Sequence, residues 1–223
     1  MVDGLDLSAL RRESIRTRVV AVPQDAFVLS HSIRFNIDPS GVASDEKIIA
    51  ALETVKLWDI IQSRIANATA EHSSIGAGQP IAESSVDVLD APLKQSPLSH
   101  GQLHLLGLAR AILLKTRSKV LLLDEATSNV DEETEKTMQQ IINDEFPDHT
   151  VITIAHRLNT IKDVDVIVVM DNGKVVEIGS PNQLLSKKVG SNDIIEVEGD
   201  GPQSVERAWF KEMWDNAHQD SSR

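Results

Sequence analysis

Short apolar runs alternate along the chain with longer segments of helical periodicity. Residues 19–22, 120–123 and 150–155 are rich in branched aliphatic side chains and are too short to be helices. Runs that are apolar throughout are typical of parallel strands covered on both faces of a sheet. Because helical segments separate these runs, the pattern predicts an α/β fold with crossover helices.

The helical signals fall between and after these strands. Residues 45–57 repeat apolar positions at helical spacing behind Ser44, a candidate N-cap. A second helix is expected to begin near Ser99, and residues 131–145 predict a highly charged helix. The apolar stripe of the second helix comprises Leu103, Leu106, Ala109 and Leu113. Residues 67–97 show little regular pattern and predict a loop-rich connection.

The last third of the chain begins with a hairpin signal. Residues 166–170 and 174–178 read as strands, and they flank Asp171-Asn172-Gly173, where Asn-Gly favours positive backbone φ. A short helix at residues 181–186 follows. Residues 205–218 predict a final helix, whose aromatic side is expected to pack on its own domain rather than on a partner.

Composition narrows the possible functions. A net charge of −12 argues against a general surface for nucleic acid or anionic membranes, whose phosphates would be repelled. There is no cysteine, and no run approaches the roughly 20 apolar residues that span a bilayer. No signal peptide is apparent at the start. Any membrane role is therefore expected through a partner or through missing sequence.

Two carboxylates end the strand predicted at residues 120–123. Ligands of α/β sheets lie at the carboxyl edge of the strands. There Asp124 is suited to hold Mg²⁺, and Glu125 to polarise an attacking water. Taken alone the pattern is weak, because an apolar strand also ends in Asp-Glu by chance.

A second candidate element is Ser99-His100-Gly101-Gln102, where a loop enters a helix. Unpaired N–H groups and the helix dipole favour an anion at this position, and glycine allows close approach of a phosphate. The alternative is a plain serine N-cap, which any helix can have.

Together these motifs resemble those of the ATP-binding cassette (ABC) family, in the family's order over roughly residues 5–185. The family's Q-loop is similar to Val22-Pro23-Gln24-Asp25, and its signature motif is similar to Leu98-Ser99-His100-Gly101-Gln102. Its Walker B strand is similar to Leu121-Leu122-Leu123-Asp124-Glu125. Its D-loop is similar to Ser128-Asn129-Val130-Asp131, and its switch-histidine loop is similar to Thr153-Ile154-Ala155-His156. Two features narrow the resemblance to the second cassette of multidrug-resistance-associated (C subfamily) exporters. They are the stretch Asn36-Ile37-Asp38-Pro39 and His100, which stands where the usual signature motif has glycine.

The resemblance implies a P-loop NTPase-like cassette with a RecA-like parallel sheet and an α-helical signature subdomain, at about residues 41–115. It implies a partial cassette over residues 1–186, an acidic linker at 187–204 and a C-terminal helix or tail at 205–223. ATP and Mg²⁺ would be the cofactors, and the partners would be a second nucleotide-binding domain and the transmembrane domains of an exporter, at the cytoplasmic face of a membrane.

The resemblance also implies residue roles. Gln24 and Asp124 would serve the metal, Glu125 would act on the attacking water, and His156 would contact the γ-phosphate. The remaining nucleotide contacts would come from Ser99, His100, Gly101, Gln102 and Asp131.

The phosphate loop of such a domain, G-x-x-x-x-G-K-[ST], does not occur in this sequence. The Gly173-Lys174 pair has Val168 in place of the first glycine and lies in the predicted hairpin. A cassette without its first strands and phosphate loop is expected to be inactive by itself and to expose apolar faces of its sheet. The chain could be a piece of a working ATPase, or a non-catalytic subunit that supplies its signature and D-loop to a partner in trans. A soluble ABC ATPase of repair or translation is a weaker reading.

Overall fold

The computed structural model describes residues 4–25, 27–73, 85–93, 98–124, 130–155, 158–187 and 208–219. The chain divides into two compact units, Met1–Ile154 and Ala155–Arg223. Within the described parts of both units, no helix is long and apolar enough to cross a lipid bilayer.

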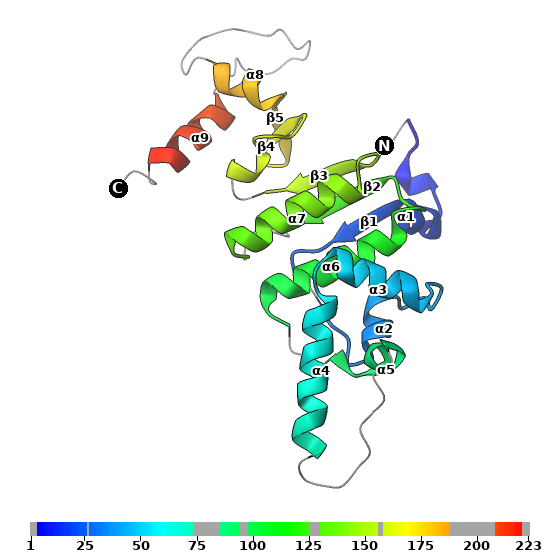
Figure 1. Ribbon diagram of the computed structural model, residues 1–223. Coiled ribbons are helices and arrows are strands. Elements are labelled where there is room, and N and C mark those ends of the chain that lie inside the picture. The colour runs from blue at the N-terminus through cyan, green and yellow to red at the C-terminus, as the bar shows by residue number, and fades with distance from the viewer. Residues whose placement is uncertain are drawn as a thin grey trace. The chain divides into compact units, whose positions relative to one another are not determined.

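The first unit contains a parallel sheet (Figure 1). Its strands are β1 (Val19–Val22), β2 (Val120–Asp124) and β3 (Thr150–Ile154), in the order β1-β2-β3. Val22 pairs with Leu123 and Asp124 with Ile154, so all three strands end at the same edge of the sheet. The parallel strands predicted by the short apolar runs are confirmed.

Helix α6 (His100–Leu114) lies between the sheet and a group of other helices (Figure 1). It contacts β1 on one side and α3 (Asp45–Thr54) on the other. The remaining helices of this unit are η1 (Leu7–Ala9), α1 (Arg12–Arg18), α2 (Ile33–Ile37), α4 (Trp58–Ser73), α5 (Ser85–Asp90) and α7 (Glu132–Glu145). Helix α3 is shorter than predicted, because Lys56 takes a positive φ of 58° just beyond its end.

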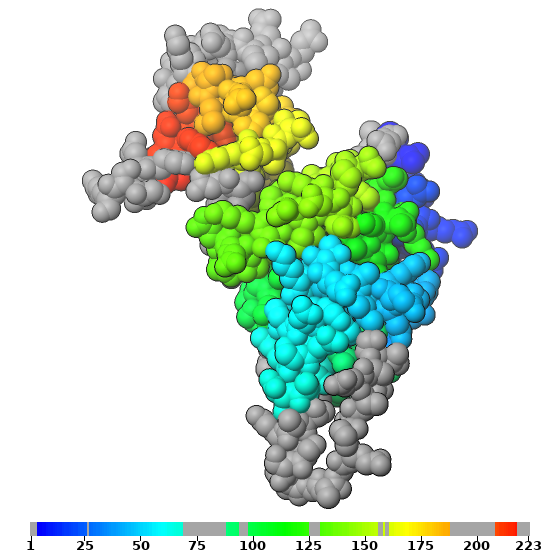
Figure 2. Space-filling model, in the orientation of Figure 1, coloured from blue at the N-terminus to red at the C-terminus, as the bar shows by residue number. Residues whose placement is uncertain are grey.

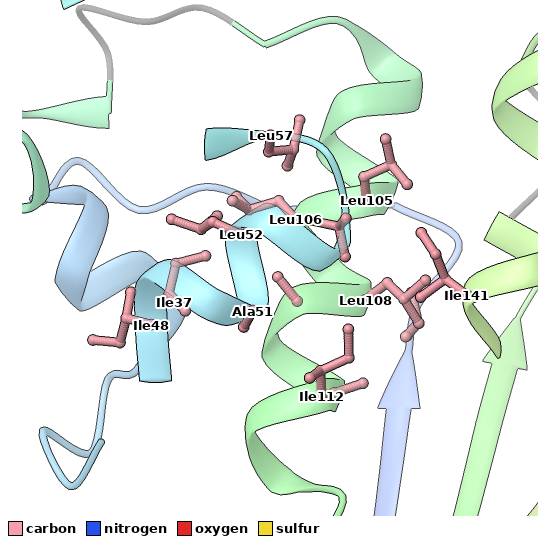
Figure 3. Close-up of a cluster of buried hydrophobic side chains, with 14 of the residues drawn as sticks. Ile37, Ile48, Ala51, Leu52, Leu57, Leu105, Leu106, Leu108, Ile112 and Ile141 are labelled. Atoms are coloured by element: carbon pink, nitrogen blue, oxygen red, sulfur yellow. The ribbon is translucent and has the colours of Figure 1, made fainter. Parts of the chain in front are cut away.

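The main core gathers around α6 (Figure 3). Leu106 and Leu108 are fully buried there, between Leu52 of α3 and Ile141 of α7. Neighbours on both sides bury more of the helix than one stripe. Of the predicted stripe, Leu106 and Ala109 are buried, whereas Leu103 and Leu113 are only half-buried. The amphipathic pattern therefore located the helix but understated how much of its surface is covered.

The expected loop at residues 67–97 is in part wrong. Helix α4 continues to Ser73, and α5 begins at Ser85. Helix α4 is anchored by Trp58, Ile61 and Ile65, which are buried on one face at helical spacing. Beyond Ile65 the helix has no further large apolar residue, so periodicity could not show how far it extends.

Strand β3 differs from the covered strand that was predicted. All of its residues are exposed, including Val151 (37%), Ile152 (50%) and Ile154 (56%). Among the described residues it pairs with β2 alone, so it forms an edge of the sheet. An apolar sequence predicts a covered strand only where other elements supply the cover. The expectation that apolar surface of the sheet would be exposed agrees with this arrangement.

The second unit is built on an antiparallel hairpin of β4 (Ile167–Asp171) and β5 (Lys174–Gly179). Asn172 and Gly173 have φ of 48° and 75°, which confirms the predicted Asn-Gly turn. The unit also contains η3 (Leu158–Ile161), α8 (Pro181–Ser186) and α9 (Trp209–Gln219).

Helix α9 packs on α8 and β5, as expected of a helix that covers its own domain. Phe210 is 1% exposed, and its backbone N–H donates to the buried Glu177 carboxylate at 2.8 Å. Lys187 donates to the other oxygen of Glu177 at 3.0 Å. Met213, on the same helix, is 41% exposed. Most of the expected acidic linker lies outside the described residues.

Candidate functional site

The carboxyl edge of the parallel sheet brings together residues from separate predicted motifs. Asp124 is the last residue of β2, and Gln24 follows the end of β1 by two residues. Because Val22 lies beside Leu123 in the register, both side chains belong to the same edge. Both residues are exposed. This edge is where α/β sheets hold ligands.

The predicted catalytic pair, Glu125 and His156, lies outside the described residues. The chain order still assigns their positions along the backbone, since Glu125 follows β2 and His156 comes two residues after the end of β3. Their side-chain roles stay predictions. Asp124, as an exposed carboxylate, offers the hard oxygen donor that Mg²⁺ prefers, so the residue present fits that ion. Among the described side chains, no group of three or more His, Cys, Asp or Glu residues is arranged to hold a metal ion by itself.

The turn at residues 98–102, here called the Ser99 turn, is held by a capping box. The Ser99 hydroxyl accepts from the Gln102 N–H at 3.3 Å, and the Gln102 side-chain oxygen accepts from the Ser99 N–H at 3.0 Å. Arg64 of α4 donates to the same Gln102 oxygen at 3.2 Å. The prediction that Ser99 is the N-cap of a helix is therefore confirmed. Gln102 stabilises the same turn through its side-chain oxygen.

Gly101 is buried, and it faces Thr134 of α7 and Val130, which comes just before that helix. A Cβ added there would lie 3.2 Å from Thr134 Cγ2 and 3.6 Å from Val130 Cγ1. Asp131 is the N-cap of α7 and accepts from the Thr134 N–H at 2.9 Å and its hydroxyl at 2.7 Å. Those hydrogen bonds from Thr134 lower the pKa of Asp131. The start of α6 thus packs directly on the start of α7, which gives glycine at 101 a packing role, and its contact with phosphate stays a prediction.

His100 faces a second histidine that sequence reasoning missed. Its ring lies 4.8 Å from that of His104, one helical turn further along α6. His100 is exposed, whereas His104 is 1% exposed and its Nδ1 has no hydrogen-bond partner. Burial lowers the pKa of His104, the nearby His100 lowers it further, and Asp25 acts in the opposite direction. The spacing of four residues on one helix was the available signal.

Asn36 organises the segment that follows Gln24. Its side-chain oxygen accepts from the Leu29 N–H at 2.8 Å. Its side-chain nitrogen lies within hydrogen-bond distance of the carbonyls of Leu29 (3.0 Å), His31 (3.3 Å) and Ser32 (3.0 Å). Asn36 is 1% exposed, so these backbone groups replace water around its amide. In the sequence, the Asn-x-Asp-Pro element carries only a family resemblance, because its structural role depends on contacts with residues 29–32.

Asp38, two residues later, shapes the next turn. Its carboxylate accepts from the backbone N–H groups of Ser40 (3.0 Å), Val42 (2.7 Å) and Ala43 (2.6 Å). Burial raises the pKa of Asp38, but these hydrogen bonds outweigh it and leave the pKa lowered. Both polar residues of the Asn-x-Asp-Pro element therefore stabilise backbone turns on either side of α2.

A shallow pocket elsewhere in this unit holds none of these residues. It lies where the surfaces of α3 and α7 meet (Figure 2), with Lys56 and Thr54 on one side and Gln140 and Asp144 on the other. The candidate site is therefore the exposed sheet edge and the Ser99 turn, rather than an enclosed cavity.

The parallel sheet, with α6 between it and a helical group, has the architecture of an ATP-binding cassette. The family model described as "ABC transporter" matches residues 1–128, more than half of the chain. In solved structures, a bacterial Atm1-family ABC exporter with ATP bound is similar, with a TM-score of 0.64 and 30% sequence identity over 83% of this chain and 29% of that one.

Curated relatives agree with the structural match. The "ABC-type transporter FG02316" of Gibberella zeae is 41% identical over 84% of this chain. The human "ATP-binding cassette sub-family C member 2" is 40% identical over 83% of it. This chain belongs to the ABC transporter family. It spans 11% of the length of each of these two relatives.

Proposed function

We propose that the chain forms part of the second nucleotide-binding domain of an ABC exporter of the C-subfamily type. It would work at the cytoplasmic face of a membrane beside transmembrane domains and a second cassette, in a protein that couples ATP hydrolysis to transport. Its relatives at about 40% identity, which include C-subfamily members, and the Asn-x-Asp-Pro element support this assignment.

We infer that the chain contributes the signature side of a composite ATP site. The observation that carries this inference is the Ser99 turn, which is held in shape by the capping box, by Arg64 and by the packing of Gly101 on Thr134. The start of α6 presents N–H groups and the positive end of the helix dipole, which suit a phosphate. Since the sequence has no G-x-x-x-x-G-K-[ST] loop, that phosphate would belong to a nucleotide held by a partner.

The chain's own residues would then divide into two groups. Ser99, Gly101 and Asp131 would position the phosphates of the partner's nucleotide, with the exposed His100 ring beside them. Asp124 and Gln24 would hold Mg²⁺ at the sheet edge, Glu125 would take a proton from the attacking water, and His156 would contact the γ-phosphate. Bound ATP supplies the phosphoanhydride that is hydrolysed. The second group acts only when a phosphate loop is present at the same edge, because γ-phosphate stabilisation depends on that loop.

The test is ATP binding and turnover with Mg²⁺, by the chain alone and by the chain mixed with a cassette that has a phosphate loop. We expect neither binding nor turnover for the chain alone, and turnover in the mixture that Ser99→Ala weakens. Turnover by the chain alone, abolished by Glu125→Gln, would contradict the proposal. The exposed Thr116 at the end of α6, as Thr116→Ala, is the control for Ser99→Ala.

A second candidate function is a non-catalytic subunit that binds another ABC protein. The exposed strand β3 favours it, since Val151, Ile152 and Ile154 form apolar surface at a sheet edge that a partner could cover. Co-purification with a complete transporter, lost on Ile152→Lys without loss of folding, would support this function.

A further inference from the structure

Arg110 connects two parts of the candidate site that are far apart in sequence. It lies on α6, the helix that begins with the Ser99 turn. Its Nη2 donates to the Phe27 carbonyl at 3.0 Å, and its Nε donates to the Asn36 carbonyl at 2.6 Å. The guanidinium carbon also lies 4.8 Å from the centre of the Phe27 ring. Phe27 follows Gln24 by three residues, so Arg110 holds the chain just after a predicted metal-binding residue.

The geometry of Arg110 makes these contacts directional. Two N–H groups donate to two carbonyls that are separated along the chain, while the guanidinium carbon lies over an aromatic ring. Burial lowers the pKa of Arg110, in keeping with a cation removed from water and satisfied by carbonyl oxygens. A planar, forked cation defines a position for residues 27–36, which a single apolar contact would not do.

A second connection ties the same segment to the chain that leads into the Ser99 turn. The Ile33 N–H donates to the Ala91 carbonyl at 3.0 Å, and the Leu93 N–H donates to the His31 carbonyl at 3.1 Å. Ser32 and Pro92 form an isolated antiparallel bridge between them. Residues 27–36 are therefore attached to α6 by Arg110, and to the approach to α6 by backbone pairing.

We propose that Arg110 is a positioning residue that fixes the segment after Gln24, residues 27–36, on helix α6. Displacement of that segment is thereby transmitted to the helix whose first turn is the Ser99 turn. This rests on the proposed function, in which Gln24 and Ser99 serve nucleotides on the two sides of one domain. Helix α6 acts as the rigid element, because its buried face is packed on both the sheet and α3.

The experiment measures the position of the segment directly. The chain has no native cysteine, so spin labels can be placed at Ser30→Cys and Thr116→Cys, both of them exposed positions. Pulsed electron paramagnetic resonance then gives the distribution of distances between the segment and the end of α6. We expect one narrow peak in the otherwise unchanged chain. Arg110→Met should lower the ratio of docked to displaced segment about tenfold, since it removes hydrogen bonds from a charged donor.

Matched variants separate positioning from stability. Arg117→Met removes an exposed arginine just beyond the same helix and should leave the distribution unchanged. Arg110→Lys keeps the charge but lacks the forked donors, so it should give an intermediate distribution. The circular dichroism spectrum identifies variants that fold, and Arg110→Lys decides the question if Arg110→Met does not fold.

An unchanged distance distribution in folded Arg110→Met, or in Arg110→Lys where only that variant folds, would overturn the proposal. A displaced segment in a chain with native circular dichroism would support it, since a merely structural residue would not move the segment alone. The measurement needs no nucleotide. A negative result here therefore leaves the ATP proposal standing, and failure of the ATP assay leaves the measured position of the segment unchanged.

Discussion

Replacing Asn36 by alanine removes the side chain that shapes residues 29–32. Its nitrogen has two hydrogens, so it can donate to only two of the three nearby carbonyls, and its oxygen accepts from the Leu29 N–H. The loss is thus three hydrogen bonds, each worth about 1 kcal/mol. Because Leu29 and His31 are exposed, water can satisfy part of what remains. We expect Asn36→Ala to lower the free energy of unfolding by about 2–3 kcal/mol.

Aspartate at the same position gives a sharper test, because it is nearly isosteric with asparagine. Its carboxylate could still accept from the Leu29 N–H but would face carbonyl oxygens where the amide donated. Burial and these oxygens would raise the pKa of the new carboxyl above its ordinary value of about 3.9. The folded state would then hold its proton to higher pH than the unfolded state. Asn36→Asp should accordingly be less stable than Asn36→Ala at pH 7 and should recover as the pH falls toward about 5.

The assay is urea unfolding followed by Trp58 fluorescence, in a background carrying Trp209→Phe and Trp214→Phe. Trp58 is buried in the first unit, and the other two tryptophans belong to the second, so the signal reports only the first unit. Asn67→Ala, at an exposed position on α4, is the matched control and should change the unfolding free energy little. Equal losses for Asn36→Ala and Asn67→Ala, or no pH dependence in Asn36→Asp, would refute the role given to Asn36.

Three further predictions concern single side chains. The pKa of His104 is lowered from 6.5 in the folded chain, so the unfolded chain takes up a proton at a higher pH than the folded chain does. The free energy of unfolding should therefore fall as the pH drops through about 6.5, and it should level off below the pKa of the folded state. His104→Gln should flatten that profile in thermal unfolding. Ile152→Thr on β3 should reduce self-association measured by light scattering, with little change in the free energy of unfolding, because Ile152 is 50% exposed. Unchanged scattering would show that the chain does not self-associate through this strand. Glu177→Ala should release α9 to limited proteolysis at a cost of about 1.5–3 kcal/mol, whereas Glu177→Gln, which keeps an acceptor for the Phe210 N–H, should lose less.

Local patterns were enough to predict much of the secondary structure. The parallel strands, the Asn172-Gly173 turn, the short helix α8 and the Ser99 cap all depend on residues close together in sequence. Strand propensity, positive φ at Asn-Gly and a hydroxyl at an N-cap act within a few residues. Gln24 and Asp124 each follow an apolar run in the sequence, and the register of β1 and β2 then places both at one sheet edge.

Contacts between distant residues decided the rest. The sequence by itself determined which family the motifs resemble, where the described strands and several of the helices lie, and that Ser99 begins a helix. Only the tertiary structure showed that Gly101 packs on Thr134, that β3 is exposed, and that Arg110 holds the Phe27 segment 83 positions away in the chain. Periodicity records which face of an element is apolar, but it does not record which element covers that face, because that depends on how the whole chain packs.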